Sequence, residues 1–127
     1  MTSRFPDLSP EKLSEYRQVA LRRQKARIVK AKSRREKGWE LARKAAKLLR
    51  EEYRAGRIVV FGSLLHESRF TEWSDVDIAA WGIPSELTFK AIGAVMDLDP
   101  SIEVNLVDVN TCPESLLKNI QTDGIDL

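Results

Sequence analysis

Three short stretches rich in apolar and β-branched residues constrain the fold of this 127-residue chain more than any other feature. Residues 57–61 (Arg-Ile-Val-Val-Phe) have the composition of a buried strand, and Gly62 ends it. Residues 75–80 and 102–109 alternate polar with apolar side chains, which gives each stretch one face toward a core. A helix over residues 85–96 is expected to join these two strands, and a last helix follows the third strand. This order predicts a small α/β domain.

The first third of the chain is predicted to be helical. Ser9 caps a helix whose first residue is Pro10, and nothing breaks that helix before about Arg35. Apolar residues are too sparse along this stretch to form a packed face. We therefore expect a helical arm that projects from the domain or lies over it.

A second helix is expected after Gly38, which is a weak point in the helical pattern. Apolar residues then recur at intervals of three and four until Gly56, and Trp39 belongs to this stripe and is assigned to the core. The chain accordingly divides into a basic helical extension over residues 1–37 and the α/β domain over residues 38–127.

Charge is distributed unevenly along the chain. Residues 1–57 contain 18 Lys and Arg against 7 Asp and Glu, residues 58–127 contain 3 against 12, and the net charge is only +2. The acidic part could hold a divalent cation, and the basic part could attract an anionic partner. Three interpretations of the basic helix stay open: a solvated helix, a nucleic-acid contact through phosphates, or a helix that binds a protein partner or a second copy.

Composition excludes several classes of protein. Apolar residues make up 43% of the chain and charged residues 31%, as in a folded domain. Uninterrupted apolar runs are only a few residues long, whereas a transmembrane helix needs about 20, so no membrane association is expected. Residues 1–7 lack the features of a secretory signal, and the single cysteine, Cys112, cannot form an internal disulfide. We expect a cytoplasmic protein.

A turn and an acid pair form the pattern that points to chemistry. Gly62 lacks a Cβ, so its backbone can approach a ligand, and a helix that begins at Ser63 would offer free N–H groups and a hydroxyl to an anion. Asp75 and Asp77 carry carboxylates on one face of a strand, where Mg²⁺ would relieve their repulsion and bind substrate phosphates. The combination predicts phosphoryl or nucleotidyl transfer. The alternative is an ordinary turn followed by a solvated strand face.

The same residues carry a resemblance to a known family. Residues 61–63 (Phe-Gly-Ser), followed by residues 74–78 (Ser-Asp-Val-Asp-Ile), resemble the signature of the DNA-polymerase-β-like nucleotidyltransferase superfamily. The small size is similar to that of its minimal nucleotidyltransferases, short prokaryotic proteins often encoded beside HEPN-domain toxins. The resemblance covers about residues 40–127 and leaves the basic extension unexplained.

The resemblance implies a small mixed sheet flanked by helices and a Mg²⁺-dependent reaction. That reaction would transfer a nucleoside monophosphate, expected to be AMP from ATP, to a protein or RNA acceptor. Gly62 and Ser63 match the family's triphosphate-binding pair, and Asp75 and Asp77 match its first two metal ligands. In family members that act as antitoxins, the acceptor is a tyrosine of the partner HEPN-domain toxin.

Two positions depart from the family pattern. Asn105 stands where a third carboxylate is usual, and an amide can offer a carbonyl oxygen to a metal but cannot take a proton. Catalysis is therefore expected to be slow or absent, unless Glu103 on the same face partly substitutes; Asp108 points to the opposite face. His66 stands near the place of a phosphate-facing arginine, and either takes over that role or is an ordinary surface histidine.

Three functions stay open on the sequence alone. The leading hypothesis is a nucleotidyltransferase in which Asn105 completes the site. The alternative is a catalytically weak or inactive binding module that neutralises a partner toxin by forming a complex. The third is an RNA-associated nucleotidyltransferase whose basic helix holds the acceptor. Trp73 and Trp81 flank the acid pair and could border a nucleotide, although packing is the favoured role of both.

Overall fold

The structure is a computed structural model that describes residues 8–127. The expectation that no secretory signal begins the chain falls on residues 1–7, outside the described residues. Helices and strands alternate after one long helix. The elements are α1 (Pro10–Tyr53), β1 (Arg57–Phe61), the 3-10 turn η1 (Gly62–Leu65), β2 (Val76–Trp81), the 3-10 turn η2 (Ser85–Leu87), α2 (Thr88–Met96), β3 (Val104–Asp108), α3 (Glu114–Asp123) and β4 (Ile125–Asp126).

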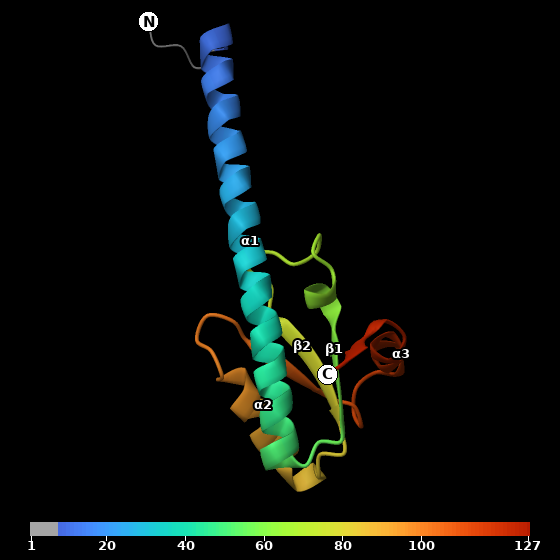
Figure 1. The fold of residues 1–127 in the computed structure, drawn as a ribbon. Coiled ribbons are helices and arrows are strands. Elements are labelled where there is room, and N and C mark those ends of the chain that lie inside the picture. The colour runs from blue at the N-terminus through green and yellow to red at the C-terminus, as the bar shows by residue number, and fades with distance from the viewer. Residues whose placement is uncertain (1–7) are drawn as a thin grey trace, which may run out of the picture.

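The four strands form one mixed sheet in the order β3-β2-β1-β4. Strand β2 runs parallel to β3, and β1 runs antiparallel to both β2 and β4. Helices α1 and α2 cover one face of the sheet, and α3 covers the other (Figure 1). The predicted small α+β domain with a mixed sheet flanked by helices is confirmed. The two-residue strand β4 was not predicted, because its length is too short to carry an alternating pattern.

Alternation of side chains along the strands divides the core into two layers. Ile58, Val60 and Ile78 are fully buried on the face that α1 and α2 cover. Val59 and Ala79 point the other way and pack with Ile120 of α3. Odd-numbered positions of β2 and β3 therefore belong to the α3 face.

Helix α1 is continuous through Gly38, so the expected helix break there is wrong. Gly38 is buried, and a methyl group on its Cα would lie 2.9 Å from Leu64 Cδ1 and 3.3 Å from Val76 Cγ2. The missing side chain lets α1 pack closely against the turn and the second strand. This contact offsets the conformational cost of a glycine within a helix.

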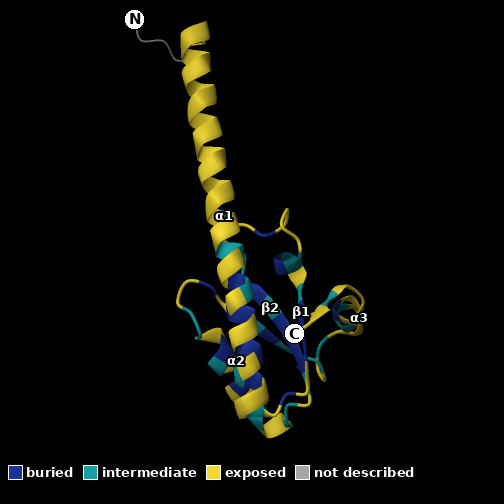
Figure 2. Ribbon diagram, in the orientation of Figure 1, coloured by how far each residue is buried: buried dark blue, intermediate teal, exposed yellow. Residues whose placement is uncertain are grey.

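The N-terminal part of α1 projects from the domain, which is one of the two arrangements that the sequence left open (Figure 1). Every residue from Pro10 to Lys30 is exposed, a length of roughly 30 Å at the rise of an α-helix (Figure 2). Contact with the domain begins in the next turn, where Arg34 and Arg35 are half-buried. Among the described residues, no helix combines the length and the apolar character needed to cross a membrane.

Candidate functional site

One row of residues across the sheet organises the site. Phe61 at the end of β1 pairs with Asp77 of β2, and Asp77 pairs with Asn105 of β3. Because strand pairing brings opposite residues within about 5 Å, Gly62, Asp77 and Asn105 meet at one end of the sheet. The side chains of Asp77 and Asn105 share the α3 face and are half-buried.

Gly62 adopts a backbone conformation that few other residues tolerate. Its φ angle is +79°, and a methyl group on its Cα would lie 2.9 Å from Asp77 Oδ2. Both the positive φ and the close carboxylate therefore require glycine at this position. The turn that follows β1 is thus held directly against the acid of β2.

The environment of Asp77 disfavours its charged form. Burial is the main reason that the pKa of the Asp77 carboxyl is raised above its ordinary value of 3.8. A hydrogen bond from Asn105 Nδ2 to Asp77 Oδ1, 3.4 Å long, acts in the opposite direction, and the negative charge of Asp75 raises the pKa further. A carboxylate in this position would be stabilised by a bound cation.

Asp75 lies just before β2 rather than within it, so the strand begins one residue later than predicted. Its Oδ1 atom is 3.5 Å from Arg34 Nη2 of α1, and its side chain is 37% exposed. The same guanidinium donates hydrogen bonds of 2.8 Å to the backbone carbonyls of Ser74 and Ser101. Arg34 therefore ties the basic helix to the loops that precede β2 and β3, and it supplies positive charge beside Asp75.

The contact between α1 and the acid pair was not predicted, because the residues before Gly38 were expected to form an extension separate from the domain. Arg35 adds a second anchor, because its Nε donates a 2.9 Å hydrogen bond to the carbonyl of Leu64. The sequence does indicate that Arg34 faces the domain, because Arg34 lies one turn before Gly38 and two turns before Leu41, on the helix face that packs there.

The other predicted residues lie around this row in different ways. Ser63 is half-buried at the start of η1, and His66 is exposed directly after it. Among residues 8–127, no hydrogen bond or ion pair joins the His66 side chain to the acid pair. Glu103 is exposed and precedes β3, whereas the Asp108 carboxylate accepts hydrogen bonds from Asn110 and Thr111 in the loop after it.

The donor set offers two carboxylates and one amide to a cation, which leaves its remaining positions to other ligands. Within the described part of the chain, no three His, Cys, Asp or Glu side chains gather as a metal cluster. Asp75 and Asp77 nevertheless repel each other electrostatically, and Asn105 offers an amide beside them. Mg²⁺ is commonly bound by one or two carboxylates together with substrate phosphates, so these residues fit it in that manner.

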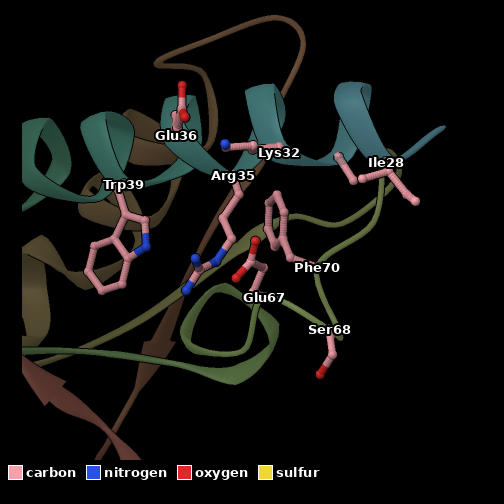
Figure 3. Close-up of a pocket in the computed structure, with 9 residues that line it drawn as sticks. Ile28, Lys32, Arg35, Glu36, Trp39, Glu67, Ser68 and Phe70 are labelled. Carbon is pink, nitrogen blue, oxygen red and sulfur yellow. The ribbon is translucent and has the colours of Figure 1, made fainter. Parts of the chain in front are cut away.

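A hollow lies between α1 and the segment after η1. Its volume is about 350 Å³, and Figure 3 shows Arg35 reaching between the rings of Trp39 and Phe70, beside Glu67. Neither Asp75 nor Asp77 lines it. Trp39 is half-buried against the core and also borders this hollow, so its predicted core position is only partly correct.

The two remaining tryptophans differ from each other. Trp81 packs beside the α3 layer with the Arg57 guanidinium 4.8 Å from its ring centroid. Trp73 is 81% exposed in the loop before β2, so the expectation that it packs is wrong.

No protein-family model, curated protein or solved structure matches the chain.

Proposed function

We propose that this protein is a Mg²⁺-dependent nucleotidyltransferase that moves AMP from ATP to a hydroxyl of a protein or RNA acceptor. In the reaction, the acceptor oxygen forms a bond to the α-phosphorus, the bond from that phosphorus to the bridging oxygen breaks, pyrophosphate leaves with the electron pair of that bond, and the proton of the acceptor hydroxyl passes to water. The acceptor would be a partner such as a HEPN-type toxin or an RNA held by the basic helix, in the cytoplasm. The proposed chemistry of this site is supported by one arrangement of residues.

The single observation that carries it is the contact between the Gly62 turn and the Asp77 carboxylate. A methyl group would not fit between them, so the turn presents bare backbone beside an acid. An anion held by the turn would therefore lie next to the carboxylates, and the two would repel unless a cation lay between them. A Mg²⁺–triphosphate complex meets both requirements.

Each residue of the chain has a distinct role in this proposal. Gly62 gives the phosphates room, and Ser63 offers its hydroxyl to them. Asp75 and Asp77 would hold Mg²⁺, whose positive charge would offset the charge that develops on the phosphates. Asn105 orients Asp77 through its amide, and it cannot serve as the base that accepts the acceptor's proton. A slow reaction is expected, since loss of a general base typically costs 10²- to 10⁴-fold in rate.

Transfer of label from α-³²P-ATP to a candidate acceptor tests the proposal. We expect Mg²⁺-dependent labelling that Asp77→Asn abolishes and that Asp123→Asn, a change of an exposed acid on α3, leaves intact. Labelling that Asp77→Asn does not reduce would refute the assignment of the site. Absence of labelling with every acceptor, together with absence of ATP binding, would refute the proposal that the protein is a nucleotidyltransferase.

A second function is favoured by a different observation. Asp75 is already paired with Arg34, and Asn105 carries no charge, so the site holds fewer free carboxylates than a fast enzyme needs. The second candidate is therefore a binding module that neutralises a partner toxin by forming a complex. It predicts that Asp77→Asn preserves both the complex and the neutralisation. Loss of neutralisation in an intact complex would exclude it.

A further inference from the structure

We propose that the exposed part of α1, together with the loop that carries Trp73, binds single-stranded nucleic acid. This proposal does not depend on nucleotidyl transfer, because the binding needs neither ATP nor Mg²⁺. If transfer does occur, the same surface would hold an RNA acceptor next to the site.

Uncompensated positive charge on α1 is the first observation. Residues 16–33 contain seven Lys and Arg and no Asp or Glu, and every one of the seven is exposed. Within the described residues, no ion pair neutralises any of them. The seven are Arg17, Arg22, Arg23, Lys25, Arg27, Lys30 and Lys32. A rod of this charge density is complementary to a polyanion.

The distribution of these charges around the helix selects the kind of polyanion. At about 100° per residue, the seven side chains are spread around the whole circumference. They leave no wide apolar face for a membrane surface, which an amphipathic helix needs. Pairing of two such helices from two copies would bring like charges together, which disfavours a second copy as the occupant. A flexible phosphate chain can follow cations on any side of the helix.

A groove at the base of this helix supplies the second observation. It has a volume of about 580 Å³ and lies between α1 and the segment 70–73. Trp73, 81% exposed, and Ile28, 59% exposed, line it together with Arg27 and Phe70. An exposed indole in a groove that an arginine also lines is a platform on which an unpaired base can stack.

The exposed indole decides which of the two hollows the base occupies. In the neighbouring hollow, which shares Ile28 and Phe70, two cations and two acids balance each other, and its aromatic rings, Trp39 and Phe70, are half-buried and buried. The groove at Trp73 has one acidic lining residue, Glu72, and one cationic lining residue, Arg27. We therefore place the base on Trp73 and the phosphates along the helix toward its N-terminal end.

Fluorescence anisotropy with a labelled 12-nucleotide oligouridylate tests the proposal. Binding is expected to weaken steeply between 50 and 200 mM salt. Each phosphate contact contributes about 0.7 to the steepness of the fall of log K with log salt. The triple variant Arg22→Ala/Arg23→Ala/Arg27→Ala should therefore make this slope shallower by about 2. Trp73→Ala should weaken binding by about 5- to 150-fold, and Trp73→Phe should restore most of it.

Control variants separate a specific surface from general attraction. Lys90→Ala/Lys118→Ala removes two exposed cations of the domain and should leave the affinity unchanged. Circular dichroism verifies that each variant is folded. Equal affinity of Trp73→Ala and wild type, or tighter binding of a blunt duplex, would overturn the assignment to single strands. Competition by polyglutamate as strong as by the oligonucleotide would instead indicate an acidic protein and overturn it too.

Discussion

Gly62 and Asp77 are in such close contact that a methyl group on the glycine Cα would lie 2.9 Å from the carboxylate Oδ2. Asp77 lies in β2, and Gly62 begins η1 directly after the neighbouring strand β1, 15 positions earlier in the sequence. Their contact fixes where the turn after β1 lies relative to the acid of β2. The geometry of the candidate site thus depends on Gly62 having no side chain.

Replacing Gly62 by alanine is expected to disturb both the fold and the site. The positive φ alone costs roughly 1–2 kcal/mol for a residue with a Cβ, and the new methyl group would also push Asp77 aside. The free energy of unfolding should fall by at least about 1 kcal/mol in a urea titration, and Mg²⁺-dependent ATP binding should be lost. A variant with wild-type stability would show that the turn is not strained in this way.

Gly38→Ala and Gly93→Ala form a matched pair of substitutions within helices. Alanine gains about 1 kcal/mol over glycine in a helix interior. At Gly93 nothing lies within 4 Å of the added Cβ, so we expect that gain. At Gly38 the Cβ would overlap buried Leu64, and overpacking of about 1–3 kcal/mol should cancel or exceed it. Thermal unfolding of both variants measures the difference; an equal rise in Tm would contradict close packing at Gly38.

Composition and side-chain alternation were sufficient to predict β1, β2 and β3, because neighbouring residues such as Ile58 and Val59 must face opposite layers whatever their partners are. The helix through Gly38 was not predictable in that way. A glycine within a helical pattern marks either a break or a close contact, and only the position of Leu64 distinguishes them. The sequence alone does not reveal that contact.

The candidate site was predictable to a similar degree. Strand pairing brings Asp77 to Asn105, as the alternation of both stretches suggests. The approach of Arg34 to Asp75 depends on the angle at which α1 crosses the sheet, which local pattern does not determine. The exposure of Trp73 likewise depends on the loop that carries it, since nothing near it in sequence indicates whether it is covered.

The raised pKa of Asp77 predicts how Asp77→Asn changes stability with pH. Because the folded state binds this proton more tightly than the unfolded state, wild-type stability falls as pH rises from about 3.8 through the raised pKa. The variant lacks this loss, so it should be more stable than wild type at pH 7, and the difference should vanish below pH 3.8. Urea titrations from pH 3 to 8 test this. A variant that is less stable at pH 7 would contradict the burial of an unfavourable charge.

Arg34→Met should detach part of α1 from the domain. The substitution removes the ion pair to Asp75 and leaves the carbonyls of Ser74 and Ser101 without their donor. We expect a loss of about 1–3 kcal/mol in the free energy of unfolding. Lys47→Met, at an exposed position of the same helix, should change it by less than about 0.5 kcal/mol. Equal effects of the two substitutions would mean that Arg34 does not anchor the helix.

Isothermal titration of ATP into the full chain tests most directly whether the Gly62 turn and the acid pair form one nucleotide site. With Mg²⁺ present, we predict one ATP bound per chain, and we predict that this binding disappears when Mg²⁺ is chelated or when Asp77 is replaced by asparagine. Asp123→Asn should bind as the wild type does. ATP binding that is unchanged by Asp77→Asn, or an absence of heat with the wild-type protein and Mg²⁺, would show that the Gly62 turn and the acid pair do not form one nucleotide site.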